Sequence, residues 1–294
     1  MAVSEAQLDT WSAQGSVQQS AATYKTIDEV LNDKRSPFYQ RFFDTFLQGS
    51  YGNDTNIYAD SDVDIAIRLT SVFYTDTSAL DATEKANYER NRSPSEYSLA
   101  KFKDEVTHWL KSNFGNGVKA GKKAIFVPSN GYRRDADVLA CAEHREYWSY
   151  PSIGSPRYRE GIIFWTTDGV EIVNYPKQHS ANCTTKHQET GNRYKRVVRV
   201  VKNIRNRMVE ERRIEEGVAP SYFLEGLLWN VPNAFFTATY KQTITDCINY
   251  IAMSDTSKFH CANGIHYLLR NGHPVCWSPD NFNRFMGALK EYWA

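Results

Sequence analysis

Two short pairs of aspartates stand where the sequence predicts β-strands. Asp62 and Asp64 open one apolar stretch, and Asp135 and Asp137 alternate with small apolar residues in another. Side chains two positions apart on a strand point to the same face of a sheet, so each pair can share a cation. Hard divalent cations prefer such carboxylate oxygens and keep substrate phosphates among their other ligands. The chemistry predicted is phosphoryl transfer, with Asp62, Asp64 and one of the later pair holding two Mg²⁺ ions.

Gly49 and Ser50 precede the first acidic pair and suit the approach of a phosphate. Glycine lets the backbone come close to an anion, and the serine adds a hydroxyl donor. A lone acidic pair usually lies on a solvated surface, but its combination with Gly49 and Ser50 and with an apolar strand favours a metal site. For the second acidic pair a simpler interpretation stays open, in which these aspartates pair with Arg133 and Arg134.

A basic stripe follows in the second half of the chain. Lys195, Arg199 and Lys202 lie three or four positions apart, so they share one face of a predicted helix. Between residues 186 and 213 there are ten lysines and arginines against three glutamates, a local excess in a chain whose net charge is +1. Such a stripe is often a plain solvated face. In a chain that also has a predicted phosphate site, it favours a clamp for triphosphates.

Composition limits the kind of protein. Apolar residues make up 41% of the 294 residues and charged residues 23%, as in soluble globular proteins. The near-neutral charge argues against a protein that coats nucleic acid, and no stretch has the roughly 18 uncharged apolar residues that a membrane span needs. The N-terminus has neither the basic nor the apolar region of a signal peptide, so we expect a cytoplasmic protein. The five cysteines form no C-x-x-C pair and predict neither disulfides nor a zinc site.

The elements that must position these residues follow from periodicity and from turn residues. The spacing of Phe38, Phe42 and Phe46 predicts a helix over residues 36–47 that leads into the glycine and serine. A capping box at 93–96 predicts the start of a further helix. Apolar alternation predicts strands, the last two joined as a hairpin, over 62–69, 123–127, 133–140, 162–166 and 170–173. From about residue 175 the pattern becomes helical, with helices at 191–209, 220–230, 237–253 and 279–291.

The predicted organisation is an α/β half followed by a helical half. We expect residues 1–174 to form an α/β core that includes an N-terminal helix. Residues 175–294 are expected to form a helical lobe that acts as a nucleotide clamp.

The sequence resembles a known superfamily of enzymes. Gly49 and Ser50, the D-x-D of Asp62 and Asp64, and the later strand with Asp137 are similar to the polymerase-β-type nucleotidyltransferases. Within that superfamily the chain most resembles the bacterial cGAS/DncV-like nucleotidyltransferases (CD-NTases), through segments in its helical half as well. The resemblance implies an α+β fold in which a nucleotidyltransferase core, a mixed sheet with helices, packs against a C-terminal helical lobe. The two lobes would enclose a central cleft.

The resemblance also implies roles for individual residues. Asp62, Asp64 and Asp137 would be the metal ligands and catalytic residues, with Asp137 assisting deprotonation of the acceptor hydroxyl. In the family, a lysine on a helix and a serine shortly after it hold the β- and γ-phosphates of the donor, and Lys202 and Ser221 match these positions. The nucleotide-binding residues expected besides these two are Gln48, Gly49, Ser50, Lys195, Arg199 and Tyr222.

Tyr222, which follows Ser221, has two competing interpretations. Tyr222 matches an aromatic residue that stacks on a base in the family, an interaction worth ~1–3 kcal/mol if the ring is accessible. Its neighbours in the sequence are apolar, so plain core packing stays open for Tyr222. Glu225 is expected to be structural.

The activity implied by the resemblance is a Mg²⁺-dependent condensation of nucleoside triphosphates, ATP or GTP or both, into a cyclic di- or trinucleotide. Mn²⁺ would substitute for Mg²⁺. The product would act on a separate effector protein in antiphage (CBASS) signalling. Apart from the resemblance, the exposed-looking C-terminal residues 290–294 could serve as a handle for a regulatory or other partner protein. We expect no membrane and no stable nucleic-acid partner. A non-cyclising nucleotidyltransferase that modifies a protein, an RNA or a small molecule stays open, whereas a catalytically inactive binding module is disfavoured by the intact aspartates.

Overall fold

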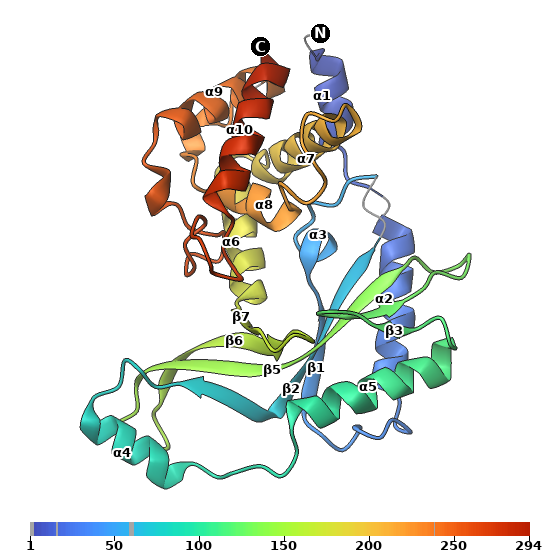
Figure 1. The fold of residues 1–294 in the computed structure, drawn as a ribbon, viewed down its shortest axis with the longest axis vertical. Helices are drawn as coiled ribbons and strands as arrows, with labels where there is room; N and C mark the ends of the chain where they lie inside the picture. Colours follow the sequence, from blue (N-terminus) through green and yellow to red (C-terminus); the bar gives the residue numbers. More distant parts are fainter. Residues whose placement is uncertain (1–2, 16, 59–61, 238) are drawn as a thin grey trace. The chain divides into compact units, whose positions relative to one another are not determined.

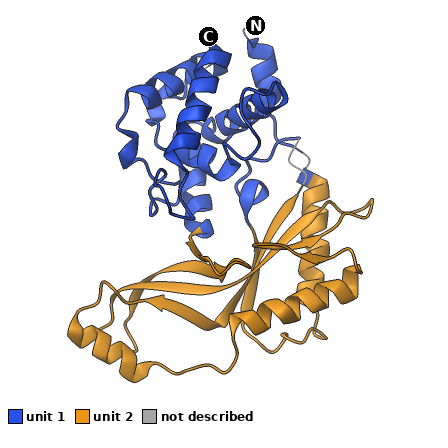
Figure 2. Ribbon diagram, viewed as in Figure 1, with its two compact units in different colours: residues 1–17, 48–61, 176–294 blue, residues 18–47, 62–175 orange. Residues whose placement is uncertain are grey.

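The computed structural model describes residues 3–15, 17–58, 62–237 and 239–294. The chain divides into two compact units, drawn in different colours in Figure 2. The sheet unit consists of Gln18–Leu47 and Asp62–Tyr175, and the helical unit consists of Met1–Val17, Gln48–Ser61 and Pro176–Ala294. These limits differ from the expected single boundary at residue 174, because the chain that follows Leu47 packs with the helices before it returns to the sheet.

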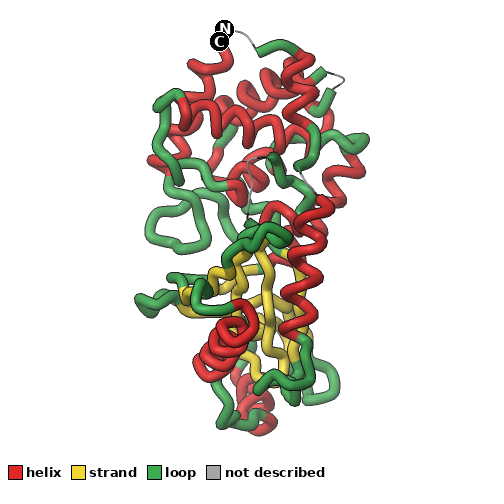
Figure 3. Tube along the Cα trace, turned by 90° about the vertical axis from the view of Figure 1, so that its right-hand side faces the viewer, coloured by secondary structure: helices red, strands yellow, loops and turns green. Residues whose placement is uncertain are grey.

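Among the described residues, the sheet unit contains a seven-stranded mixed sheet (Figures 1 and 3). Its two long strands, β2 (Val63–Asp76) and β5 (Ala136–Ser149), run parallel, with Val63 opposite Ala136. β1 (Phe43–Leu47) pairs antiparallel with β2. β5 pairs antiparallel with β4 (Ile125–Val127), which pairs with β3 (Lys119–Ala120). Further along, β5 pairs antiparallel with β6 (Arg157–Trp165), which pairs with β7 (Glu171–Asn174). Because β2 and β5 start side by side, the two aspartate pairs lie at the same end of the sheet.

Apolar side chains explain why β2 lies inside the sheet. Val63, Ile65 and Ile67 are fully buried, as expected of a strand with parallel pairing and a covered face. α5 packs on β2, β4 and β5, and the Trp109 indole of α5 donates to the carbonyl of Val30 in α2 at 2.7 Å. The helices of the sheet unit are α2 (Val17–Leu31), which begins one residue before the unit, α4 (Ala82–Asn91) and α5 (Leu99–Phe114).

The predicted helix over residues 36–47 is wrong, because its second half is strand β1. The spacing of Phe38, Phe42 and Phe46 indicated one apolar helix face, yet Phe38 is fully buried whereas Phe42 is 78% exposed. The Phe38 ring instead packs edge-on against Phe102 of α5, at a centroid distance of 5.6 Å. Backbone pairing with β2, a long-range interaction, overrides the local helical spacing in this segment.

Most other predicted elements are confirmed with shifted limits. The hairpin is β6 and β7, and strand 133–140 is the first part of the longer β5. α5 begins at Leu99 with Ser98 as its N-cap, not at the capping box of 93–96. The four helices expected in the second half of the chain are α7 (Tyr194–Glu210), α8 (Ser221–Trp229), α9 (Tyr240–Met253) and α10 (Pro279–Trp293).

Helix α6 (Pro176–Glu189) was missed by the sequence analysis. Its buried side chains are His179, Cys183 and Lys186, so its inner face is largely polar and offers no apolar stripe for periodicity to detect. In the described chain, none of the helices combines the length and the apolarity that crossing a membrane requires.

The helical unit is built around large buried side chains. Tyr194 of α7 is fully buried and donates its hydroxyl to the carbonyl of Glu225 at 2.8 Å. Trp277 is 2% exposed and donates its indole N–H to the carbonyl of Val218 at 2.7 Å. Besides α6 to α10, the unit contains α1 (Glu5–Ser12) and the single-turn helix α3 (Gly49–Gly52).

Substitution of the two phenylalanines tests the strand assignment. Phe38→Ala should lower the free energy of unfolding by about 3–5 kcal/mol, because it removes a buried ring and leaves a cavity. Phe42→Ala should change it by no more than about 0.5 kcal/mol, because the ring is exposed. Urea unfolding of both variants gives the comparison. Equal losses would support the helix with one apolar face and contradict β1.

Candidate active site

Three aspartates meet at the end of the sheet where β2 and β5 begin. Asp64 lies directly opposite Asp137 in the parallel pairing of the two strands. Asp62 is the residue before β2, two positions from Asp64, so the two side chains point to the same face. Asp62 is exposed, and Asp64 and Asp137 are half-buried. The structure therefore places Asp64 and Asp137 side by side on neighbouring strands, with Asp62 two positions from Asp64.

The electrostatics of Asp137 show that these carboxylates interact. Burial raises the pKa of Asp137, and the negative charges of Asp62 and Asp135 raise it further. Asp135 has a local partner of its own, because its carboxylate accepts the backbone N–H of Ser129 at 2.6 Å. Asp137, not Asp135, is thus the member of the second pair that lies beside Asp64.

This donor set fits a divalent cation. Carboxylates held close together repel one another in their ionised form, and a bound cation removes that repulsion. The raised pKa of Asp137 is the signature of that repulsion together with burial. Asp62, Asp64 and Asp137 as metal ligands nevertheless stay a prediction of the sequence analysis.

Gln48, Gly49 and Ser50 form the start of α3 in the helical unit. Gln48 is the N-cap of this turn, and it follows β1, whose last residue Leu47 lies opposite Ile65 of β2. Gly49 has a φ of 62°, a left-handed conformation that a residue with a Cβ adopts only with strain. A glycine is therefore required at the place where the sequence predicts close approach of a phosphate.

The chain after this turn is polar yet buried. Asn53 is 5% exposed, and Thr55 and Asn56 are fully buried. The carbonyl of Gly52 accepts the Ser180 hydroxyl at 3.1 Å, and the Asn56 side chain accepts the Gln14 amide at 2.8 Å. Residues 52–56 are called the buried segment below, although the Asp54 side chain within it is exposed. They keep their conformation through such hydrogen bonds.

The basic stripe of α7 also binds the buried segment. Lys195, Arg199 and Lys202 are 4%, 7% and 0% exposed. The Lys202 ammonium donates to the carbonyl of Thr55 at 2.9 Å, and Arg199 donates to the carbonyl of Asp54 at 2.6 Å. Lys195 donates to the Asp54 carboxylate at 3.0 Å, and burial lowers the pKa of Arg199 to about 10. The stripe is thus not a solvated face, and its contact with phosphates stays a prediction.

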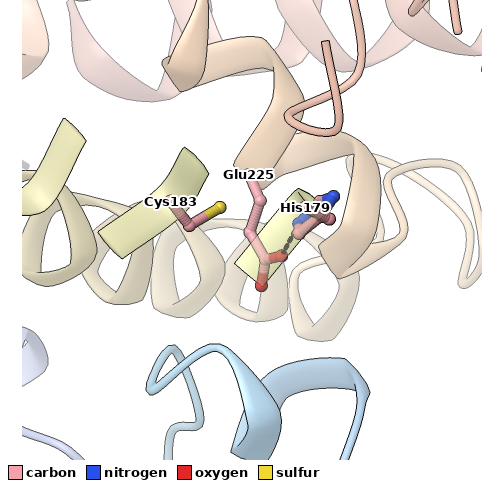
Figure 4. Close-up of side chains that lie close together, drawn as sticks. All are labelled: His179, Cys183 and Glu225. Carbon is pink, nitrogen blue, oxygen red and sulfur yellow. Dashed lines mark hydrogen bonds and ion pairs between the residues drawn. The ribbon is translucent and has the colours of Figure 1, made fainter. Parts of the chain in front are cut away.

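Glu225 of α8 is the acidic centre of this region. Its side chain is 2% exposed, as is that of His179 in α6, and the two are joined by a hydrogen bond of 2.6 Å (Figure 4). The second partner is Asn53, whose amide donates to Glu225 at 2.9 Å, and the third is the hydroxyl of Thr55. The expectation that Glu225 is structural agrees with its complete burial and with these contacts.

The charges of this pair stabilise each other. Burial opposes the charge of His179, but its interactions with Cys183 and with the Glu225 carboxylate outweigh burial and raise the pKa of His179 to about 10. Burial likewise opposes the charge of Glu225, yet hydrogen bonding to His179, the charges of His179 and Lys202 and the hydroxyl of Thr55 hold its pKa below the usual value. Both shifts favour the charged forms, an imidazolium and a carboxylate.

In the described part of the chain, one group of three His, Cys, Asp or Glu residues has its potential ligand atoms within 4.8 Å of one another: His179, Cys183 and Glu225. Figure 4 shows that His179 and Glu225 point toward each other. Nε2 of His179 is engaged by the Glu225 carboxylate, so two of the three residues already bind each other.

Ser221 and Tyr222 begin α8, on the same helix as Glu225. The Tyr222 ring stacks on that of His179 with centroids 4.5 Å apart, and its hydroxyl accepts the Asn263 amide at 3.1 Å. Burial raises the pKa of the Tyr222 hydroxyl well above its ordinary value. The Tyr222 ring therefore packs largely against other side chains of the helical unit. Stacking of Tyr222 on a base stays a prediction, as does the contact of Ser221 with phosphate.

The sequence analysis missed the residues that organise the buried segment. No role was predicted for His179. Asn53 and Thr55 belong to the polar run that follows α3, which looks like an exposed loop. Their burial becomes visible only when Glu225, far along the chain, is placed beside them.

Known proteins that resemble the chain share both its sequence and its fold. A family model for the C-terminal helical domain of cGAS/DncV-like nucleotidyltransferases matches residues 181–294. Over its whole length the chain is 36% identical to a cyclic UMP-AMP synthase of Rhodothermus marinus, with 98% of that protein covered. It is also 33% identical over its whole length to the cyclic nucleotide synthase CdnE01 of Staphylococcus haemolyticus, with 99% of that protein covered.

Two solved structures are similar along nearly the full chain. The structure of Rhodothermus marinus CdnE c-UMP-AMP synthase with Apcpp and Upnpp has a TM-score of 0.88 and 35% identity, over 99% of this chain and 96% of that one. The structure of Elizabethkingia meningoseptica CdnE cyclic dinucleotide synthase with GTP and Apcpp has a TM-score of 0.78 and 30% identity, over 99% and 98% of the two chains.

Removal of the titrating imidazole tests the buried ion pair. The folded-state pKa of His179 is raised from 6.5 to about 10, so its stabilising contribution is complete below pH 6.5 and is lost as the pH rises toward 10. His179→Gln should cost about 3–5 kcal/mol of unfolding free energy at pH 6, because it leaves a buried carboxylate without its counter-charge. The difference from wild type should shrink between pH 6.5 and 10.

Urea unfolding at several pH values measures this difference. His108→Gln is the matched control, because the His108 side chain on α5 is 72% exposed. Its unfolding free energy should stay close to that of the wild type at every pH. A gap between wild type and His179→Gln that is constant from pH 6 to 10 would contradict a charged imidazole at this position.

Proposed function

The chain belongs to the family of cGAS/DncV-like nucleotidyltransferases, and from that premise we propose how its own residues carry out the reaction. It has the expected α+β nucleotidyltransferase fold and is an enzyme that condenses nucleoside triphosphates into cyclic oligonucleotides. We propose that the reaction depends on Mg²⁺, for which Mn²⁺ can substitute, and that it releases pyrophosphate. ATP, GTP or both are the proposed substrates, and a cyclic di- or trinucleotide is the proposed product.

The observation that supports this proposal most strongly is the placement of Asp64 opposite Asp137, with Asp62 on the same face as Asp64. These residues would hold the Mg²⁺ ions. Bound divalent cations supply charge neutralisation at the phosphates and make a hydroxyl easier to ionise. Three carboxylates gathered on one face of a sheet have no comparable use in packing, because their mutual repulsion costs stability.

Side chains of the protein then orient the reacting nucleotides and accept a proton. In the proposed step, a ribose hydroxyl of one nucleotide attacks the α-phosphorus of another, a new P–O bond forms, and the bond to pyrophosphate breaks in line with it. Asp137, which would lie beside the attacking hydroxyl, accepts its proton. A second attack of the same kind on the linear product closes the ring.

Binding of the donor phosphates is assigned to the turn at the start of α3. We infer that the backbone at Gln48 and Gly49 and the hydroxyl of Ser50 contact these phosphates. The left-handed φ of Gly49 supports this assignment, because it favours a glycine. A glycine has no Cβ that would obstruct a phosphate at the backbone. Lys195, Arg199, Lys202 and Ser221 are the further proposed contributors, and Tyr222 would lie against a base.

The wider role of the product is part of the proposal. The relatives described above include a synthase named for UMP and AMP and one solved with GTP and Apcpp. Base choice therefore differs between relatives of comparable similarity to this chain. We propose that the product acts on a separate effector protein in antiphage (CBASS) signalling and that the enzyme works in the cytoplasm, where nucleoside triphosphates are available.

A product assay tests the proposed function. The purified protein is incubated with Mg²⁺ and all four labelled ribonucleoside triphosphates, the mixture is treated with phosphatase, and the products are identified by mass. A phosphatase-resistant cyclic di- or trinucleotide containing adenine or guanine is expected. Transfer of a nucleotide to the protein itself or to an added RNA, with no cyclic product under Mg²⁺ or Mn²⁺, would instead support the non-cyclising nucleotidyltransferase.

Neutral replacements of the aspartates test their assignment. Asp64→Asn and Asp137→Asn should each lower product formation by at least about 100-fold, because the amide cannot neutralise a cation and cannot accept the proton. The free energy of unfolding of Asp137→Asn without metal should be equal to or higher than that of the wild type at pH 7. This follows because an aspartate with a raised folded-state pKa is less stable ionised in the fold than in the unfolded chain.

Asp135→Asn is the matched control for both measurements. The asparagine oxygen can still accept the backbone N–H of Ser129, and Asp135 is not among the proposed ligands. Its activity should stay within about threefold of the wild type, a difference of well under 1 kcal/mol in the barrier. Wild-type turnover in Asp64→Asn would rule out the metal site proposed at β2.

A further inference from the structure

The buried carboxylate of Glu225 uses both of its oxygens as acceptors. Oε2 accepts N–H groups from His179 at 2.6 Å and from Asn53 at 2.9 Å, and Oε1 accepts the hydroxyl of Thr55. Only an ionised carboxylate offers acceptors alone. An amide in its place would bring its own N–H groups toward at least one of these donors.

The same two residues of the buried segment also bind the predicted phosphate turn. The backbone N–H of Asn53 donates to the carbonyl of Gly49 at 3.1 Å, and the backbone N–H of Thr55 donates to the carbonyl of Ser50 at 2.9 Å. Asn53 and Thr55 thus hold the turn with their backbones and Glu225 with their side chains. A single carboxylate is connected in this way to both Gly49 and Ser50.

Two cations of α7 bind the backbone of the buried segment. Lys202 and Arg199 bind the carbonyls of Thr55 and Asp54, so they fix the path of the backbone. The side chains of Asn53 and Thr55 are oriented by Glu225. Loss of the carboxylate would leave buried donors without an acceptor, which costs roughly 1–3 kcal/mol for each group. The segment would then rearrange to satisfy them elsewhere.

We propose that Glu225, charged by its ion pair with His179, is a positioning residue that fixes the Gly49 and Ser50 turn in the geometry that binds the donor triphosphate. This inference rests on the proposed function of that turn. Glu225 acts through Asn53 and Thr55 and is not a catalytic residue. A misplacement of the turn weakens triphosphate binding and misaligns the α-phosphorus, so both KM and kcat depend on the carboxylate.

A double-mutant cycle between Glu225 and Ser50 tests the connection. Glu225→Gln and Ser50→Ala are each expected to raise the KM for nucleoside triphosphate about tenfold and to lower kcat. If Glu225 acts through the turn, the double variant should be no more than about twofold worse than Glu225→Gln alone, because coupled residues are non-additive. Multiplication of the two single effects would overturn the proposal, as would a Glu225→Gln enzyme with wild-type kcat and KM.

A core variant separates positioning from general loss of stability. Ile248→Ala on α9 removes a side chain that is 6% exposed, and it should lower the unfolding free energy by about 2–5 kcal/mol. Combined with Ser50→Ala, it should give the product of the two single effects on kcat/KM. Equal non-additivity in this pair would mean that the Glu225 result reports only loss of stability.

Two conservative substitutions of Thr55 keep the proposal testable if the Glu225→Gln protein does not fold. Thr55→Val removes the hydroxyl that donates to Glu225 and keeps the shape, and Thr55→Ser keeps the hydroxyl. Thr55→Val should raise KM several-fold and Thr55→Ser should restore most of the wild-type value. Equal KM values for the two variants would contradict the proposal.

Direct binding distinguishes this inference from the proposed function. The affinity of the wild type, Glu225→Gln, Thr55→Val and Thr55→Ser for ATP is measured by calorimetry with Mg²⁺ present. If no cyclic product forms, but ATP binds to the wild type and binds more weakly to Glu225→Gln and Thr55→Val, only the proposed function fails. If cyclic product forms and the variants bind ATP as the wild type does, only the positioning inference fails.

Discussion

The contact between the Glu225 carboxylate and His179 is the buried interaction on which the proposed phosphate turn of the helical unit depends. A lone buried charge is unstable in a protein interior, and a buried pair is stable only when hydrogen bonds satisfy its remaining acceptors and donors. In this protein the remaining acceptors are satisfied by Asn53 and Thr55. The pair therefore requires the buried segment to be present, and the segment requires the pair.

This constraint explains why the cations of α7 face inward. The buried segment contributes carbonyl groups that need donors, and Lys202 and Arg199 provide them at 2.9 and 2.6 Å. A buried lysine is tolerated when its ammonium is hydrogen-bonded and a negative charge lies nearby. The charge of Lys202 in turn helps to keep the pKa of Glu225 low. Positive charges along α7 and negative charge on α8 thus hold the same stretch of chain.

The aspartates of the sheet unit follow a simpler rule. Asp64 and Asp137 face each other because two parallel strands start in register, and the spacing of two residues then adds Asp62 to the same face. The raised pKa of Asp137 shows that the fold tolerates repulsion at this place. Such a local cost in stability is common where a site is built for a ligand.

Much of this arrangement could be predicted from the sequence, and the exceptions have physical causes. The D-x-D strand and the helices after residue 190 were predictable because apolar periodicity is local. The strand at 43–47 was predicted as helix because its pairing with β2 is a long-range interaction. α6 was missed because its buried residues include His179 and Lys186, which are stable there only through partners elsewhere in the chain.

The predicted basic stripe shows most clearly what residue spacing alone cannot predict. Spacing correctly placed Lys195, Arg199 and Lys202 on one helix. Whether that face meets solvent or protein depends on what packs against it, and the buried segment comes from residues more than a hundred positions earlier. Glu225 was expected to be structural, but its partners could not be named before the fold was known.

Amide hydrogen exchange of the buried segment measures its dependence on Glu225 most directly. The N–H groups of Asn53 and Thr55 are bonded to the carbonyls of Gly49 and Ser50, so both should exchange slowly in the wild-type protein without ligand. In Glu225→Gln they should exchange at least about tenfold faster, while amides of α9 such as that of Ile248 keep their wild-type rates. Unchanged protection of Asn53 and Thr55 in a folded Glu225→Gln protein would contradict the account.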